Sequence, residues 1–140
     1  MRIDHAGYAV SSIKQYLADF FVPLFQPESV TEIMEDPLQG VRVAFATMPG
    51  GARVELIEPM TPDSPVNKIL DARRGGLYHL CYEVEHLEEQ IESFQKKGCL
   101  LISGPTPAVA FQQRRIVFLF TPQRDVIELV ERERAGTRHA

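Results

Sequence analysis

Apolar residues, many of them β-branched or aromatic, gather in four short runs of this 140-residue chain, two in each half, with few polar residues among them. Such runs predict β-strands, because branched and aromatic side chains favour the strand conformation. Within each half, a short segment of glycine, proline or polar residues separates the two runs, and such a segment predicts a hairpin turn. The four predicted strands are 41–48, 52–58, 114–120 and 125–131.

Apolar residues recur with helical spacing in other segments. They occupy every third or fourth position from 13 to 21 and again from 87 to 94, which predicts an amphipathic helix in each segment. Gly98 follows the second helix as a left-handed stop. A shorter helix is predicted in the connection between the halves, with Ser64 as its N-cap and Pro65 as its first residue.

The two halves share a sequence motif. IDHAGYAV at 3–10 matches LYHLCYEV at 77–84, with histidine, tyrosine and valine in register. Each copy precedes a predicted helix and a predicted hairpin, and a weaker strand is expected near 29–34 and 99–103, so the chain contains two βαβββ modules. The expected organisation is a first module over 1–59, a helical linker over 60–75, a second module over 76–131 and a polar tail over 132–140.

Composition limits the classes of partner. The formal net charge is -4, with 15 basic and 19 acidic residues, which argues against binding to nucleic acid. No apolar run is long enough to span a membrane, and the sequence opens directly on a predicted strand, so we expect a cytoplasmic location and no membrane partner. Cys81 and Cys99 have no CxxC spacing and are expected to be reduced, buried strand residues.

Two histidine–glutamate pairs occupy equivalent positions in the two modules. His5 corresponds to His79 with an offset of 74 residues, and Glu55 corresponds to Glu128 with an offset of 73. A pseudo-twofold axis between the modules would bring both pairs to one concave surface. The next residues on the strand face of His5 are glycine and alanine, which leave room there for a ligand.

Two neutral imidazoles and two carboxylates suit Zn, Co, Ni, Mn or Fe in the divalent state. Four protein ligands leave two octahedral positions for vicinal oxygens of a substrate, and the metal would act as a Lewis acid on a carbonyl. Taken singly, each residue is better explained as a core histidine or a solvated glutamate; the symmetric set of four favours a metal. Residues not expected to be ligands are His86, His139 and four solvated glutamates, Glu32, Glu35, Glu58 and Glu131.

With these residues the sequence resembles the vicinal oxygen chelate superfamily, which includes glyoxalases, bleomycin resistance proteins and dioxygenases. Within it the chain is most similar to the methylmalonyl-CoA epimerases and their glyoxalase I relatives. The resemblance covers nearly the whole chain and rests on IDHAGYAV, VELIEPMTPDSPVNKIL, GGLYHLCYEVEHLEEQIESFQKKG and IVFLFTP with IELVE. It implies an α+β, glyoxalase-like fold: paired βαβββ modules forming a curved, mostly antiparallel half-barrel sheet with a central cleft.

The resemblance also implies a site and an activity. The metal ligands of the family fall on His5, Glu55, His79 and Glu128, and the implied cofactor is one divalent ion. The implied reaction is proton abstraction next to a thioester or ketone carbonyl by an epimerase or isomerase, with Glu55 or Glu128 as the catalytic base and an acyl-CoA as the candidate substrate. The chain departs from the family at Tyr78, which replaces the first histidine of a GxHH motif.

A second departure bears on the substrate, because FTPQRD at 120–125 stands where epimerases commonly carry His-Pro-Lys. Two alternatives therefore stay open beside the epimerase: a glyoxalase I-type lyase acting on a glutathione hemithioacetal, and a metal-free binding module of the resistance type. A homodimer is expected because related proteins are often dimers.

Overall fold

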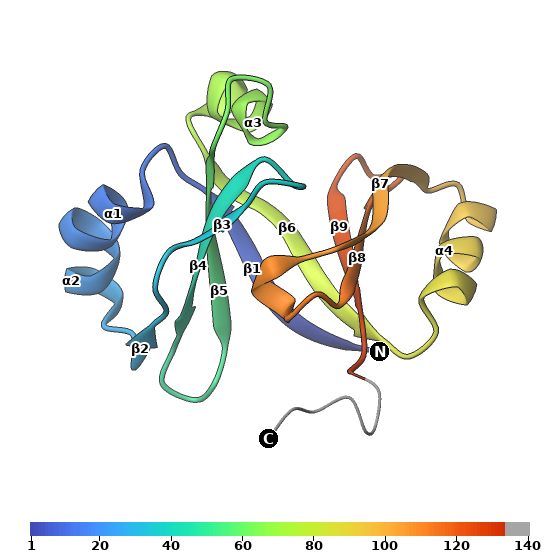
Figure 1. Ribbon diagram of the computed structural model, residues 1–140, viewed down its shortest axis with the longest axis horizontal. Helices are drawn as coiled ribbons and strands as arrows, with labels where there is room; N and C mark the ends of the chain where they lie inside the picture. The colour runs from blue at the N-terminus through green and yellow to red at the C-terminus, as the bar shows by residue number, and fades with distance from the viewer. Residues whose placement is uncertain (134–140) are drawn as a thin grey trace. The chain divides into compact units, whose positions relative to one another are not determined.

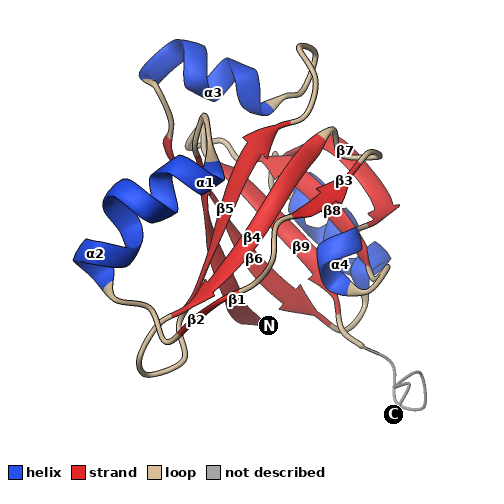
Figure 2. Ribbon diagram, turned by 60° about the vertical axis from the view of Figure 1, so that its left-hand side comes forward, coloured by secondary structure: helices blue, strands red, loops and turns tan. Residues whose placement is uncertain are grey.

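The computed structural model describes residues 1–133, which form an α+β fold dominated by strands (Figures 1 and 2). The chain divides into two compact units. The N-terminal unit is His5–His79, and the C-terminal unit comprises Met1–Asp4 together with the chain from Leu80 onward. Two strands, β1 (Arg2–Ala9) and β6 (Gly76–Val84), contribute residues to both units.

The N-terminal unit is built on a sheet in which β1 runs parallel to its neighbour β5, and β4 pairs antiparallel with β5, β2 and β3. The central strands β4 and β5 are the apolar runs that the sequence predicts as a hairpin. Strand β4 pairs with β5 on one side and with two short strands, β2 and β3, on the other. The strands are β2 (Ser29–Val30), β3 (Met34–Asp36), β4 (Val41–Thr47) and β5 (Arg53–Pro59).

One helical segment covers a face of this sheet (Figure 1). It comprises α1 (Ile13–Tyr16), a π-helical turn η1 (Leu17–Phe21) and α2 (Val22–Phe25). The segment widens just before Pro23, which has no N–H to donate to the carbonyl one turn earlier. The core beneath it consists of Val10, Ile13, Ala44 and Leu56. The connection that follows β5 holds α3 (Val66–Arg73).

The C-terminal unit repeats this plan. Strands β9, β8 and β7 are adjacent in that order and antiparallel, and α4 packs on one face of them. The core between helix and sheet is apolar throughout: Val84, Leu87, Ile91, Cys99, Val117, Leu119, Ile127 and Leu129. The elements are α4 (Leu87–Lys96), β7 (Leu100–Pro107), a 3-10 turn η2 (Val109–Phe111), β8 (Arg115–Phe120) and β9 (Val126–Glu131).

The prediction of an α+β, glyoxalase-like fold is confirmed, and the predicted elements are present in the predicted order. The prediction of one weak strand near 29–34 was wrong in detail, because this segment forms two short strands, β2 and β3. The module boundaries, the half-barrel and the central cleft stay predictions. Within residues 1–133, no helix is long and apolar enough to cross a bilayer. Most of the predicted polar tail, including His139, lies outside the described residues.

Candidate metal centre

The strand pattern of the N-terminal unit places His5 and Glu55 on one face of its sheet. Glu55 lies directly opposite Gly7 in the parallel pair of β1 and β5, and His5 is two residues from Gly7 on the same strand. Leu56 points the other way, into the core beneath the helical segment. His5 and Glu55 therefore share the face that the helices do not cover.

Three polar atoms meet on this face and form a nearly equilateral triangle. The Nε2 atoms of His5 and His79 are 3.2 Å apart, and Glu55 Oε1 lies 3.3 Å from each of them. The three side chains come from β1, β5 and the first half of β6. All three residues are buried, with 2%, 4% and 2% of the surface of His5, Glu55 and His79 exposed.

The spacing of these atoms fits a bound metal ion. Ligands about 2.0–2.2 Å from a metal lie about 3.3 Å apart in a tetrahedron and about 2.9 Å apart in an octahedron. The observed separations of 3.2–3.3 Å fall within this range. One ligand atom from each residue also lies within 4.8 Å of those of the other two. Buried imidazoles and a carboxylate with this spacing can hold a divalent transition metal without rearrangement.

Gly7 makes room for the His79 ring. A Cβ atom at this position would lie 2.6 Å from Nε2 and 2.8 Å from Nδ1 of His79, closer than atoms pack. The glycine is required by this close approach of side chain to strand. Sequence reasoning identified residue 7 only as a small residue beside His5. That an imidazole from β6 lies against it could not be inferred from the strand pattern.

Electrostatics keep the Glu55 carboxyl ionised. Burial raises the pKa of this group, but hydrogen bonds and charge from His5 and His79 outweigh burial and lower the pKa to about 2. An ionised carboxylate held between two imidazole nitrogens matches what a divalent cation needs from its ligands. The buried cluster therefore offers a divalent metal two imidazole nitrogens and one ionised carboxylate.

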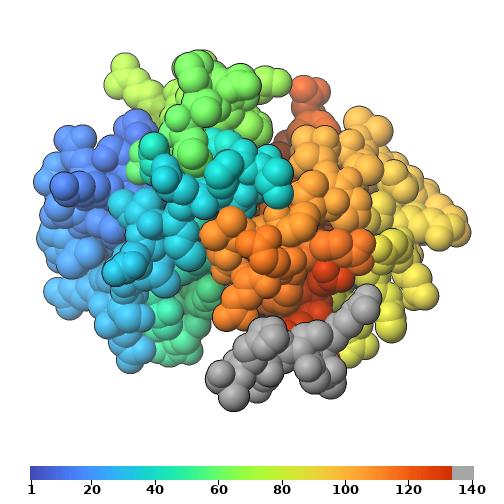
Figure 3. All heavy atoms as spheres, in the orientation of Figure 1, coloured from blue at the N-terminus to red at the C-terminus, as the bar shows by residue number. Residues whose placement is uncertain are grey.

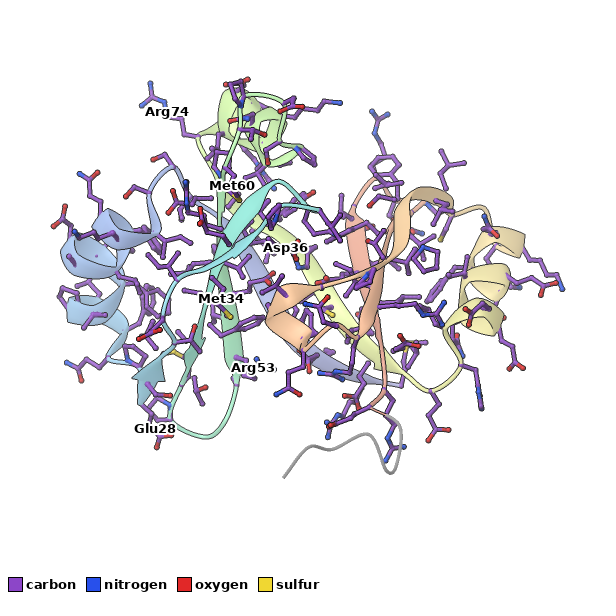
Figure 4. All side chains as sticks on the ribbon, in the orientation of Figure 1. Glu28, Met34, Asp36, Arg53, Met60 and Arg74 are labelled. Atoms are coloured by element: carbon purple, nitrogen blue, oxygen red, sulfur yellow. The ribbon has the colours of Figure 1, made fainter. Side chains whose placement is uncertain are left out.

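Aromatic rings and one arginine surround the three ligands. Phe45, opposite Glu55 in the β4–β5 pair, packs edge-on against His5 at 5.1 Å between ring centroids. The guanidinium carbon of Arg53 lies over the same Phe45 ring, 4.3 Å from the ring centroid. Arg53 is two residues from Glu55 and so points to the ligand face, near the lower end of β5 in Figure 4. Sequence reasoning missed Arg53, although its strand parity with Glu55 was a usable signal.

Glu128, the fourth predicted ligand, belongs to the C-terminal unit. It is buried on β9, with 2% of its surface exposed, and lies opposite Phe118 on β8. Glu55 lies opposite Phe45 in the corresponding hairpin of the N-terminal unit. The equivalence of the two glutamates thus holds in the registers of both hairpins. Its place in one ligand set with the N-terminal residues stays a prediction.

Two glutamates that were expected to be solvated are structural. Glu58 Oε1 accepts a hydrogen bond from the Ile13 N–H at 3.1 Å, at the start of α1. Glu131 Oε2 accepts hydrogen bonds from the backbone N–H and the Nε of Arg115, at 2.8 and 3.0 Å. The strand pattern correctly places both on the face opposite the ligands. The prediction of solvation was wrong because neighbouring elements cover that face.

Known proteins resemble this chain along most of its length. The chain is 31% identical over 138 residues to the uncharacterized protein YqjC of Bacillus subtilis, covering 99% of this chain and 96% of the relative. It is 27% identical over 119 residues to an ethylmalonyl-CoA/methylmalonyl-CoA epimerase of Cereibacter sphaeroides, covering 84% and 87%.

Solved structures show the same likeness. A variant of Streptomyces coelicolor methylmalonyl-CoA epimerase, in complex with 2-nitronate-propionyl-CoA, superimposes with a TM-score of 0.78 at 26% identity, covering 100% of this chain and 99% of that one. A family model described as glyoxalase/bleomycin resistance protein/dioxygenase superfamily matches residues 4–118. The chain belongs to the glyoxalase/bleomycin resistance protein/dioxygenase superfamily.

Proposed function

We propose that the protein is a divalent-metal-dependent isomerase that removes and returns a proton on the carbon next to a thioester carbonyl, as a methylmalonyl-CoA epimerase does. The observation that carries the proposal is the buried triangle of His5 Nε2, His79 Nε2 and Glu55 Oε1. The similarity to epimerases supports an acyl-CoA as the substrate. The proposed ligand set is His5, Glu55, His79 and Glu128.

The bound metal would supply Lewis acidity, polarising the carbonyl oxygen and stabilising the charge that develops on it as the proton leaves. The protein residues have separate tasks. His5 and His79 would hold the ion through Nε2, and Glu55 would balance part of its charge. Burial of the three side chains keeps water from competing for the ligand positions.

Proton transfer is better assigned to Glu128 than to Glu55. A general base works best when its pKa lies near the working pH, and the pKa of Glu55 is lowered to about 2 by the two imidazoles. A carboxylate with so low a pKa is a poor base, and coordination to a metal would lower its basicity further. We therefore propose Glu55 as a permanent ligand and Glu128 as a labile ligand, which would move the proton while it is dissociated from the ion.

Deuterium exchange tests this assignment. The metal-loaded protein is incubated in D₂O with methylmalonyl-CoA, and deuterium at the carbon between the two carbonyl groups is measured by mass spectrometry. We expect exchange with the wild-type protein. Glu128→Gln should lose at least about 100-fold in exchange rate, the low end of what a general base contributes, and should keep its metal. Glu55→Gln should lose the metal.

Other outcomes identify another function. No exchange into methylmalonyl-CoA, with turnover of the glutathione hemithioacetal, would reject the epimerase in favour of a glyoxalase-type lyase. A purified protein that takes up no Co, Ni, Mn or Zn would reject both enzymes and favour a binding module. If wild-type protein and Glu128→Gln exchange at equal rates, the assignment of Glu128 as the base is rejected, but the epimerase activity is not.

A further inference from the structure

The N-terminal unit has a second concave site that the proposed metal centre does not use. A pocket of about 430 Å³ lies between the end of β1, the helical segment and the chain that follows α3. Pockets that bind small molecules commonly have about 300–1,000 Å³. Tyr8 and Tyr16, which line the pocket, pack against the core on the helix-covered face of the sheet. The pocket therefore lies on the face opposite His5 and Glu55.

The walls of this pocket combine aromatic rings with polar groups. Tyr16 and Phe20 are stacked, with ring centroids 5.5 Å apart and planes inclined by 25°. Tyr8 and Tyr16 both line the pocket, and burial together with the charge of Tyr8 raises the pKa of the Tyr16 hydroxyl. Stacked rings next to hydroxyl groups favour a flat ligand with a polar edge. The remaining polar lining residues are Ser11, Ser12, Gln15, Asp19 and Arg74.

The backbone fixes the position of Arg74. Arg74 ends α3 in a left-handed conformation with φ 60°, and its N–H donates to the Leu70 carbonyl at 2.8 Å. Gly75 then passes so close to the Ala9 carbonyl that a Cβ atom would collide with it. Figure 3 shows α3 in green at the top of the view and the helical segment in blue below it to the left, and Figure 4 shows Arg74 beside α3, above α1. Arg74 thus lies at the edge of an aromatic pocket.

Asp19 adds the opposite charge to the same pocket. A ligand that satisfies both charged residues carries an anionic group for Arg74 and a hydrogen-bond donor for Asp19. From these walls we infer a second binding site, specific for a flat aromatic ring that bears a hydrogen-bond donor and an anionic group. An amino-substituted aromatic carboxylate and a nucleotide monophosphate share this chemistry.

Titration of the full-length ¹⁵N-labelled protein tests the inference. The probes are 4-aminobenzoate and adenosine 5′-monophosphate, each compared with its uncharged counterpart, aniline or adenosine. We expect a charged probe to shift the amides of Ser11, Ser12 and Gln15. Arg74→Gln should weaken its binding by at least about tenfold, the loss expected for one charge-assisted hydrogen bond. Shifts with 4-aminobenzoate alone identify a carboxylate ligand, and shifts with the nucleotide alone identify a phosphate ligand.

Arg124→Gln is the matched control. Arg124 is also exposed and also left-handed, with φ 69°, so the substitution removes the same charge from the same backbone conformation outside the pocket. Its probe affinity should equal that of the wild-type protein. The inference is overturned if neither charged probe shifts the pocket amides, if Arg74→Gln binds as tightly as Arg124→Gln, or if the uncharged counterparts bind equally well. None of these results depends on metal binding or on turnover.

Discussion

At the scale of single residues, the candidate centre depends on atoms that approach one another closely. The repeat of histidine and glutamate in the sequence predicted His5, Glu55 and His79 as neighbours, and the structure brings these three together. The role of Gly7 was beyond prediction, because it depends on where the ring of a distant residue lies. Strand parity alone cannot supply such a contact.

Substitution of Gly7 by alanine tests the packing of the site without changing any ligand. The added Cβ would lie 2.6 Å from His79 Nε2, so the ring must move and the triangle must open. We expect Gly7→Ala to fold with an unchanged circular dichroism spectrum and to lose most of its bound metal in elemental analysis. If Gly7→Ala binds metal with full stoichiometry and unchanged affinity, the close contact between residue 7 and the His79 ring is not needed for metal binding, and the prediction is wrong.

The ionised Glu55 predicts a dependence of stability on pH in the metal-free protein. Its pKa is 4.5 in an unperturbed carboxyl and about 2 in the folded state. Because the folded-state pKa is the lower one, the stabilising contribution is present above pH 4.5 and is lost as the pH falls toward about 2. Glu55→Gln has no such contribution to lose. Urea unfolding across this interval should show the free energy of unfolding falling more steeply in the wild type; parallel profiles would contradict the assignment.

At the scale of helices and strands, the runs of branched apolar residues and the turn residues between them predicted the order of elements well. Strands rich in branched apolar residues, such as β5 and β9, were located to within one or two residues. Strand β7 extends to Pro107, well past the predicted end at 103, because its register shifts twice against β8 and so breaks the pattern. Short edge strands such as β3 depend on pairing with β4 more than on their own sequence.

The side chain of Glu58 links β5 to the start of α1, and we expect this link to stabilise the fold. It is the acceptor for the Ile13 N–H at 3.1 Å, and its side chain is 16% exposed. Glu58→Ala should lower the free energy of unfolding by about 1–2 kcal/mol, as the loss of a buried cap does. Glu92→Ala is the control, because the Glu92–Lys96 pair on α4 is exposed and its loss should cost only about 0.3–0.5 kcal/mol. Equal losses in urea unfolding would show that Glu58 stabilises nothing at the helix start.

At the scale of the whole molecule, the repeat in the sequence corresponds to a repeat in the structure. Each unit has a hairpin in which a glutamate lies opposite a phenylalanine, and each covers one face of its sheet with a helical segment. The likeness to epimerases supports the role in proton transfer that we propose for the repeated pair. What the repeat alone could not provide is the joint placement of four side chains around one ion, because that depends on both units together.

The central claim is that His5, Glu55, His79 and Glu128 together bind one divalent metal. Crystals grown with Co²⁺ and measured at the cobalt absorption edge test it most directly. The account predicts one anomalous peak per chain, within bonding distance of Nε2 of both histidines and of one carboxylate oxygen from each glutamate. The absence of a peak at this position, or a cobalt ion bound there without Glu128, would contradict it.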